Sequence, residues 1–577
     1  MKKIKISILA FILLACGISC KKNFLDEKPL DFLSTSNAFQ SAADFNSSVY
    51  NLFGLVRAEF YTQDDNTVYD YQYRTDLAID VTAATPNLVA QITPTSGLAN
   101  DHWRRLYKIV AEANTIISRI PGSKLTDADK KIYEAKGRFF RALGYRTLVY
   151  LYGGVPLTLE EATSPKVDFV RASKKEVLTQ CIDDLVFAAA NLPAINVVKQ
   201  DGDLSKEAAN HLLSEVYLAD GQFQKSIDAA TAVITSGNLN LMTSRFNIGN
   251  TPKDENGVTV PGDVYADLFR VGNQNRSAGN REGILVIQIQ ANVPGGAGAT
   301  NLGFANAGGY CLERVHVPLT RDANLNGVSF FAWPASDYSS GGRGVGFMGP
   351  SFWFQDSVWR NFNNDIRNAN HNFVRKFKVT NPANPLYGTY LDFYNLPAGT
   401  KGTSGQVLVS GKPSRALYAF QAKATTPYQH PQELYDAANR KWPFSLKDGA
   451  AFTFRDEYMF RLAETYLIRA EAYLGLGKTP EAAGDINVVR TRSNADPVLP
   501  ANVNIDYILD ERMRELGVEE KRMLTLHRLG KWYDRVVKCN SYYAPQADPK
   551  YNLWPIPQSV IEANREAKLE QNPGYPQ

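Results

Sequence analysis

Two stretches of the chain interleave aromatic rings with amides, carboxylates and arginine. A flat ring can pack against the apolar C–H face of a pyranose, while the polar side chains bind the sugar hydroxyls. In residues 60–75, the polar members are Gln63, Asp64, Asn66, Asp70 and Arg74. The aromatic members are Tyr61, Tyr69, Tyr71 and Tyr73. We predict that these four tyrosines contact a sugar ligand.

The second stretch, residues 330–362, holds three of the seven tryptophans. Trp333 and Tyr338 lie beside a glycine-rich loop at residues 341–344, so we expect them to be exposed. Together with Arg343 of that loop, they are predicted ligand contacts. A denser aromatic run of partly helical character is more typical of core packing, and its members are Phe352, Trp353, Phe354 and Trp359.

The sequence lacks the motifs of common catalytic, nucleotide-binding and metal-binding sites. The sequence contains no HExxH, GxSxG, phosphate-loop, Rossmann or EF-hand pattern. The acidic group at residues 64–70 lacks the glycine and terminal glutamate of an EF-hand loop. We therefore predict no catalytic residue, no metal site, no cofactor and a protein that is not an enzyme. Carboxylate pairs are abundant, so a glycoside hydrolase with two carboxylates about 5–9 Å apart stays open as an alternative.

Length and charge narrow the class of protein. A chain of 577 residues suits one large body or two closely packed domains. The net charge is +4, and removing Lys2, Lys3 and Lys5 from the 63 basic residues leaves 60 against 59 acidic ones. Nucleic-acid-binding proteins usually show a basic excess or stripe. We predict no nucleic-acid partner for the near-neutral body.

The N-terminus has the pattern of a lipoprotein signal peptide, predicted over residues 1–19. A basic start is followed by a short apolar segment at residues 6–15, too short to span a bilayer. A cysteine ends the segment, so we predict lipidation at Cys20, with Cys16 as the alternative. The other cysteines are widely separated, and we expect them to be buried small hydrophobic residues: Cys181, Cys311 and Cys539.

Helical periodicity dominates outside the middle of the chain. Thr126, Ser173 and Ser205 are expected N-caps, and Ser173 with Glu176 forms a capping-box pattern. Trp103 shares a helical face with apolar neighbours and is expected in the core. Helices are predicted over residues 103–120, 126–152, 173–186, 205–217 and 458–476.

Two distant segments resemble each other. Residues 216–221 and 472–477 each end an amphipathic helix at a glycine and precede a second, alanine-rich helix. This arrangement is typical of tetratricopeptide-like helical hairpins. The copies lie far apart in the sequence, so stacked pairs with large insertions are expected rather than a regular solenoid.

The middle of the chain differs in composition. Between residues 241 and 455 glycine, asparagine, proline and aromatic residues rise, and residues 284–289 are typical of a short strand. Long irregular stretches in a compact protein are usually functional. We predict a mainly α fold with tetratricopeptide-like hairpins, long irregular loop insertions and minor short β-strands. Its parts are a helical region (20–240), a variable ligand-binding region (241–455) and a C-terminal helical region (456–577), forming one compact body.

Short motifs at both ends of the chain occur in a characteristic order. They lie at residues 20–29, 103–114, 134–142, 151–157, 461–472, 511–516, 528–530, 553–557 and 571–575. Together these motifs resemble the SusD/RagB family of outer-membrane nutrient-binding lipoproteins. The first motif, a cysteine shortly before Phe-Leu-Asp, is the reason for favouring Cys20.

The resemblance implies a cell-surface lipoprotein anchored in the outer membrane. It also implies binding of a nutrient, expected to be an oligo- or polysaccharide, and delivery to a SusC-like TonB-dependent transporter. The motifs belong to the scaffold, so the predicted ligand contacts come only from the aromatic pattern. The alternatives are a tetratricopeptide-like lipoprotein scaffold for protein partners and the glycoside hydrolase already named.

Overall fold

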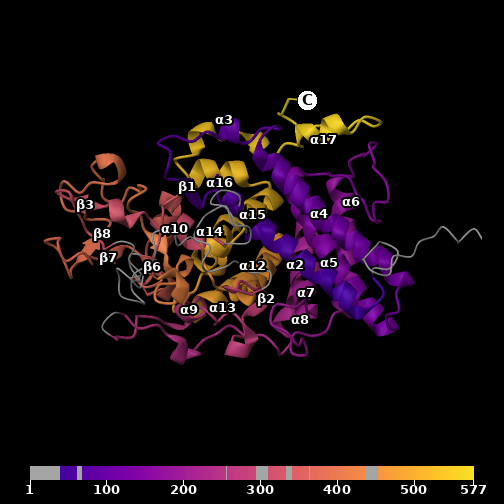
Figure 1. The fold of residues 1–577 in the computed structure, drawn as a ribbon, viewed down its shortest axis with the longest axis horizontal. Helices are drawn as coiled ribbons and strands as arrows, with labels where there is room; N and C mark the ends of the chain where they lie inside the picture. The colour runs from indigo at the N-terminus through magenta and orange to yellow at the C-terminus, as the bar shows by residue number, and fades with distance from the viewer. Residues whose placement is uncertain are drawn as a thin grey trace, which may run out of the picture.

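The computed structural model describes residues 39–61, 68–254, 257–293, 310–332, 341–362, 364–435 and 452–576, without the side chains of Val68 and Tyr69. Figure 1 shows helices on the right and in the centre, and an irregular part with short strands on the left. The predicted mainly α fold with irregular insertions is confirmed. The predicted signal peptide and Cys20 lie outside the described residues.

The N-terminal region forms a layer of long helices, drawn in indigo to purple in Figure 1. Along this layer α4 packs against α5, α5 against α6 and α6 against α7, while α2 packs against α4. Helix α5 is central, and its side chains from Phe139 to Tyr152 are all buried. The bounds are α2 Ala42–Phe60, α3 Leu88–Gln91, α4 Gly97–Arg119, α5 Asp127–Tyr152, α6 Lys174–Asn191, α7 Lys206–Ala219 and α8 Phe223–Ile234.

The predicted N-caps are present. The side chains of Thr126, Ser173 and Ser205 each accept a hydrogen bond from a backbone N–H of the first helical turn. Ser173 and Glu176 form the predicted capping box. Such caps satisfy N–H groups that have no partner within the helix. Trp103 lies in the core, as predicted.

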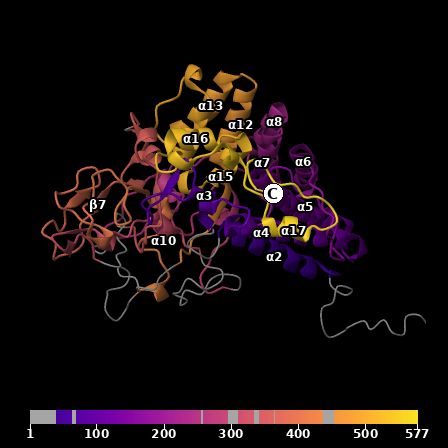
Figure 2. The same cartoon turned by 90° about the horizontal axis from the view of Figure 1, so that it is seen from above.

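The two similar segments fold as helical hairpins that stack on each other, as seen in Figure 2. Helix α7 pairs with α8, α12 (Leu462–Gly475) pairs with α13 (Thr479–Arg492), and α8 packs against α12. Gly221 and Gly477 end the first helix of each hairpin at positive φ, 74° and 72°. A Cβ on Gly475 would approach the Phe223 ring to 2.7 Å, so the absent side chain permits the close packing of α8 and α12.

The C-terminal helices lie between the N-terminal layer and the irregular part, in gold in Figure 1. Helix α15 packs against α5, which joins the two ends of the chain. Buried Asp76 adds to this junction by pairing with Arg522 at 2.7 Å and Arg535 at 2.8 Å. The bounds are α14 Ile505–Glu515, α15 Arg522–Leu529, α16 Trp532–Cys539 and α17 Gln558–Ala563.

In the described residues, the irregular part contains antiparallel strand pairs, short 3-10 helices and the α-helices α9 Val264–Asp267, α10 Leu312–His316 and α11 Phe352–Gln355. Each described sheet has two strands. The pairs are β1 (Ala78–Asp80) with β5 (Met348–Pro350), β3 (Asn324–Leu325) with β4 (Val328–Ser329), β6 (Phe373–Val374) with β9 (Phe420–Gln421), and β7 (Lys376–Lys378) with β8 (Tyr390–Asp392).

One predicted helix begins later than expected. Residues 457–461 form strand β10 (Glu457–Arg461), paired with β2 (Gly283–Ile287), and α12 begins only at Leu462. The strand β2 is buried throughout, so its backbone N–H and C=O groups need hydrogen-bonding partners. The start predicted at residue 458 is therefore wrong, because pairing with a distant strand overrides the local helical period.

Candidate functional site

A groove of about 1260 Å³ opens where segments far apart in the sequence meet. Its walls come from residues 79–84, the beginning of α11, the loop at residues 403–415, and residues 540–542 after α16. We call it the Phe352 groove. Its volume exceeds the roughly 300–1000 Å³ of ordinary small-molecule pockets, so it has room for an extended ligand.

Backbone pairing brings two of these walls together. Strand β1 pairs with β5, placing Ile79 opposite Gly349. Next to this pair, Ser351 caps α11 by accepting the Phe354 N–H at 3.2 Å, and its hydroxyl donates to the Asp76 carbonyl at 2.6 Å. Phe352 is thereby held in the first turn of α11, beside residues 79–84.

Aromatic rings line the groove. Phe352 is 49% exposed and Tyr394 is 37% exposed, while Tyr542 is half-buried. The Tyr394 hydroxyl donates to the Gln355 carbonyl at 3.2 Å, and the Tyr542 hydroxyl donates to the Ala83 carbonyl at 3.1 Å. Burial raises the pKa of Tyr542 to about 12, so this phenol is neutral at physiological pH. Fixed rings with free faces are suited to stacking on sugar C–H surfaces.

Polar groups surround the rings. Asp356 and Arg360 form an ion pair, with Nη2 of Arg360 2.7 Å from Oδ2 of Asp356. Nε of Arg360 also donates to Oδ2 of Asp356, at 3.0 Å, and the side chain is largely exposed, so Nη1 can donate to a ligand. Hydroxyl and amide groups complete the lining: Thr82, Thr403, Ser404, Gln406, Ser410, Ser414, Asn540 and Ser541. This mixture suits a ligand rich in hydroxyl groups.

A shallower groove of about 420 Å³ continues from the Phe352 groove. The two share Asp356, Arg360 and Tyr394. The far side of the shallower groove includes Trp359 and Arg375. Tyr394 therefore lies at the junction, where it can contact a ligand that extends along either groove.

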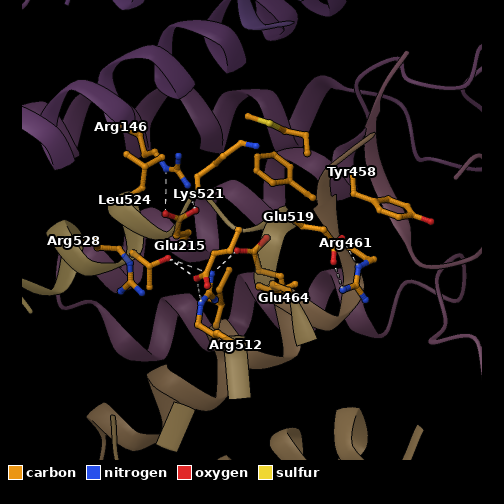
Figure 3. A pocket seen from close by; sticks show the side chains of 16 residues that line it. Arg146, Glu215, Tyr458, Arg461, Glu464, Arg512, Glu519, Lys521, Leu524 and Arg528 are labelled. Carbon is orange, nitrogen blue, oxygen red and sulfur yellow. Dashed lines mark hydrogen bonds and ion pairs between the residues drawn. The ribbon is translucent and has the colours of Figure 1, made fainter. Parts of the chain in front are cut away.

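A different hollow, shown in Figure 3, is enclosed by charged side chains. Its volume of about 40 Å³ has room for a few water molecules only. Arg146 pairs with Glu215 at 2.5 Å, and Arg512 pairs with both Glu464 and Glu520 at 2.6 Å. Burial alone would raise the pKa of Glu464, but Arg512 holds it well below the usual range. These pairs connect helices, and we assign this hollow a structural role.

The structure places Tyr61, Tyr71 and Tyr73 in the hydrophobic core. Each is 7% exposed or less. The Tyr61 hydroxyl donates to the Tyr458 carbonyl at 2.9 Å, and the Tyr71 hydroxyl donates to Glu59. A ring enclosed on both faces has no surface for stacking. The sugar contacts expected of these three residues are therefore corrected to core packing.

The remaining predicted ligand contacts are Tyr69, Trp333, Tyr338 and Arg343. The Tyr69 side chain, Trp333 and Tyr338 lie outside the described residues. Arg343 is half-buried, and its backbone N–H donates to Oε1 of Glu313 at 2.8 Å. Arg343 is not among the described residues that line the Phe352 groove.

Sequence reasoning missed the aromatic residues of the groove. In the run expected to be core, Phe354 and Trp359 are buried, but Phe352 is half exposed. Ser351 is the N-cap residue that sets the start of α11. This signal in the sequence could have indicated that Phe352 lies in the first turn of a helix. The rings of Tyr542 and Tyr543 pack edge to face with their centroids 4.8 Å apart, and Tyr543 takes the buried place.

Metal-binding and membrane-spanning features were sought in the described part of the chain. There, no three His, Cys, Asp or Glu side chains gather closely enough to hold a metal ion. Asp70, weighed as a calcium ligand, pairs instead with Arg74 and His102. No helix within the same residues combines the length and apolar character needed to cross a bilayer.

Two family models match this chain, one in its C-terminal part and one in its N-terminal part. The SusD family model matches residues 350–575. A SusD-like model described as starch-binding and associating with the outer membrane matches residues 23–218. The matches include the helical frame at both ends of the chain, the beginning of α11 and residues 79–84.

Individual relatives agree with these matches. A SusD-like protein of Formosa agariphila is 23% identical over 98% of this chain and 97% of its own length. The starch-binding protein SusD of Bacteroides thetaiotaomicron is 35% identical over 23% of this chain and 25% of its own. The solved structure of a laminarin binding SusD-like protein has a TM-score of 0.63 at 21% identity, covering 93% of this chain and all of that one. By its motifs, its helical frame and these similarities, the chain belongs to the SusD family.

Proposed function

We propose that this protein binds an oligo- or polysaccharide in the Phe352 groove and delivers it to a SusC-like TonB-dependent transporter. The observation that carries the proposal is the pair of exposed rings, Phe352 and Tyr394, which line the groove together with the Asp356–Arg360 ion pair. The names of two relatives, a starch-binding protein and a laminarin binding protein, support a glucan as the ligand.

The proposed location is the outer surface of the outer membrane, through a lipid on Cys20. Several acyl chains on one N-terminal residue anchor a protein body firmly. The signal-peptide pattern and the description of the matching N-terminal model support this location. Tyr69, Trp333, Tyr338 and Arg343 stay proposed ligand contacts.

We further propose that the bound ligand is not cleaved. Among the described residues that line the groove, the carboxylates are Asp80 and Asp356. Asp356 is paired with Arg360, and Asp80 accepts hydrogen bonds from the N–H and hydroxyl of Thr82 at 2.8 and 2.6 Å. Both are held by neighbouring donors, whereas a glycosidase needs one carboxyl group to act as a proton donor.

Affinity electrophoresis in gels containing starch, laminarin or xylan tests the proposal. Phe352→Ala and Tyr394→Ala are each expected to weaken binding about tenfold, the effect of losing roughly 1.4 kcal/mol of stacking. The matched control is Tyr387→Ala, because Tyr387 is 57% exposed and is not a lining residue of the groove. Equal retardation of all variants, or release of reducing sugar by the purified protein, would contradict the proposal.

A further inference from the structure

Helix α2 has two distinct faces. One face carries the core residues Phe45, Val49, Leu52, Val56 and Phe60. The other carries Tyr50, Phe53, Gly54 and Arg57, which follow the i, i+3, i+4, i+7 spacing of a single helical stripe. This second stripe lines a groove of about 600 Å³, here called the α2 groove.

The opposite wall of the α2 groove comes from residues 200–203 and from the end of β2. Gly202 lets these segments meet, because its φ is 86° and a Cβ there would lie 2.8 Å from the Val286 carbonyl oxygen. The acidic side chains of this wall are held in place. Asp203 pairs with Lys136 at 2.8 Å, and Asp201 accepts a hydrogen bond from Ser277 at 2.5 Å.

The floor of the α2 groove is the backbone at Gly54. Glycine is unfavourable inside a helix relative to alanine. No steric demand explains it here, since a Cβ on Gly54 would meet nothing within 4 Å. The missing side chain leaves a flat strip between Tyr50, which is 56% exposed, and Arg57.

We infer that the α2 groove is a second carbohydrate-binding site, for an uncharged oligosaccharide lying across Gly54 with one ring stacked on Tyr50. Tyr50 is positioned by a hydrogen bond from its hydroxyl to Oε1 of Gln200 at 3.4 Å. Amides of Gln200 and Gln290 line the groove and can bind hydroxyl groups, whereas the amide nitrogen of Gln288 already donates to Oδ1 of Asn275 at 3.0 Å. The volume lies within the roughly 300–1000 Å³ typical of small-ligand sites.

The inference shares a ligand class with the proposed function but rests on different residues. The Phe352 groove is first disabled with the double variant Phe352→Ala/Tyr394→Ala, and binding is measured by affinity electrophoresis with starch, laminarin and xylan. The double variant is expected to keep residual retardation by at least one of these polysaccharides. Adding Tyr50→Ala is expected to reduce that residual binding about tenfold.

Gly54→Ala tests whether Gly54 serves ligand binding or the structure of α2. Alanine favours the helix, so this variant is expected to raise Tm while weakening the residual binding. Gly484→Ala is the matched control, because Gly484 also lies inside a helix with nothing within 4 Å of a Cβ. It is expected to raise Tm and leave binding unchanged.

Three outcomes would overturn the inference. The first is the absence of Tyr50-dependent retardation with all three polysaccharides. The second is that Tyr387→Ala loses as much binding as Tyr50→Ala. The third is that the protein binds casein peptides through Tyr50 and does not bind the polysaccharides. Loss of binding only with Tyr50→Ala, and not with the changes at Phe352 and Tyr394, would instead reject the Phe352 groove and keep the α2 groove.

Discussion

Aromatic residues of the same type take opposite roles in this protein according to their immediate contacts. Full burial of a phenylalanine side chain contributes about 1.5–3 kcal/mol, so the half-exposed Phe352 gives up part of that contribution. Tyr71, by contrast, is fully buried with its hydroxyl bonded to Glu59. A ring left exposed at the edge of a groove is therefore a stronger indication of binding than a ring in an aromatic-rich segment.

The pH dependence of stability should reveal the buried His102. Its Nδ1 lies 2.6 Å from Glu59 and its Nε2 lies 3.3 Å from Asp70. Burial opposes the charged form, but Glu59 and Asp70 outweigh it and raise the pKa of His102. Because the folded pKa is raised, this stabilisation is complete below the unfolded value of about 6.5 and is lost as pH rises through the folded value. His102→Gln should therefore lower the unfolding free energy most at pH 6 and progressively less toward pH 9.

His527→Gln is the control for this series. Burial lowers the pKa of His527 to about 3, so its imidazole is neutral throughout the same range. As pH falls toward 6, the unfolded chain protonates this imidazole and the folded protein does not, so replacing His527 should cost less at pH 6 than at pH 9, the opposite trend to His102. A His102 effect that is flat between pH 6 and 9, or that follows the trend of His527, would show that His102 is not charged in the folded protein.

Residue types in the sequence did not distinguish the core tyrosines from those that line the Phe352 groove. Tyr71 and Tyr394 both lie among polar neighbours in the sequence. They differ in tertiary surroundings, because Tyr71 packs on Phe60 and His102, whereas Tyr394 lies at the junction of two grooves. Such long-range packing leaves no periodic signal, so composition alone could not separate the two roles.

At the scale of elements, local signals were sufficient wherever the contacts are local. The caps at Thr126, Ser173 and Ser205 and the glycines that end α7 and α12 were predictable, since each acts within one turn of its helix. The strand β10 and the pair β1–β5 were not, because their partners come from distant parts of the sequence. The β1–β5 pair builds one wall of the Phe352 groove, and the β10–β2 pair sets the start of α12.

The turn of the second hairpin offers a test of backbone conformation. Gly477 has a φ of 72°, and a Cβ there would meet nothing within 4 Å. Gly477→Ala should therefore lower the unfolding free energy by about 1–2 kcal/mol through conformation alone. Gly484→Ala has equally open space but helical backbone, and should raise the unfolding free energy. Urea unfolding of both variants measures the difference, and equal effects would contradict the role assigned to positive φ.

At the scale of the whole molecule, buried charges join regions that the sequence keeps apart. Glu515 of α14 forms ion pairs with Arg367 of the irregular part at 2.9 Å, with Arg461 at the end of β10 at 2.6 Å, and with Arg492 of α13. All four side chains are 1% exposed or less. The helical frame is thus tied directly to the irregular part that carries one wall of the Phe352 groove.

Removal of the charge at Glu515 should therefore affect the whole fold. Burial alone would raise the pKa of Glu515, but the three arginines hold it well below the usual range. With a lowered folded pKa, its contribution is present above the unfolded value of about 4.3 and is lost only as pH falls through the folded value. Glu515→Gln should cost about 3–5 kcal/mol at pH 7, because it leaves buried arginines partly uncompensated.

Urea unfolding at pH 7 checks this expectation, with Glu562→Gln as the control. Glu562 is exposed on α17, where a substitution should change the unfolding free energy by no more than about 0.5 kcal/mol. Arg367 also pairs with Glu511 of α14 at 2.8 Å, so the two parts stay joined without Glu515, and its loss should shift one cooperative transition rather than split it in two. Two separate transitions in Glu515→Gln would show that the two parts depend on this carboxylate to unfold together, whereas an effect as small as that of Glu562→Gln would contradict its structural role.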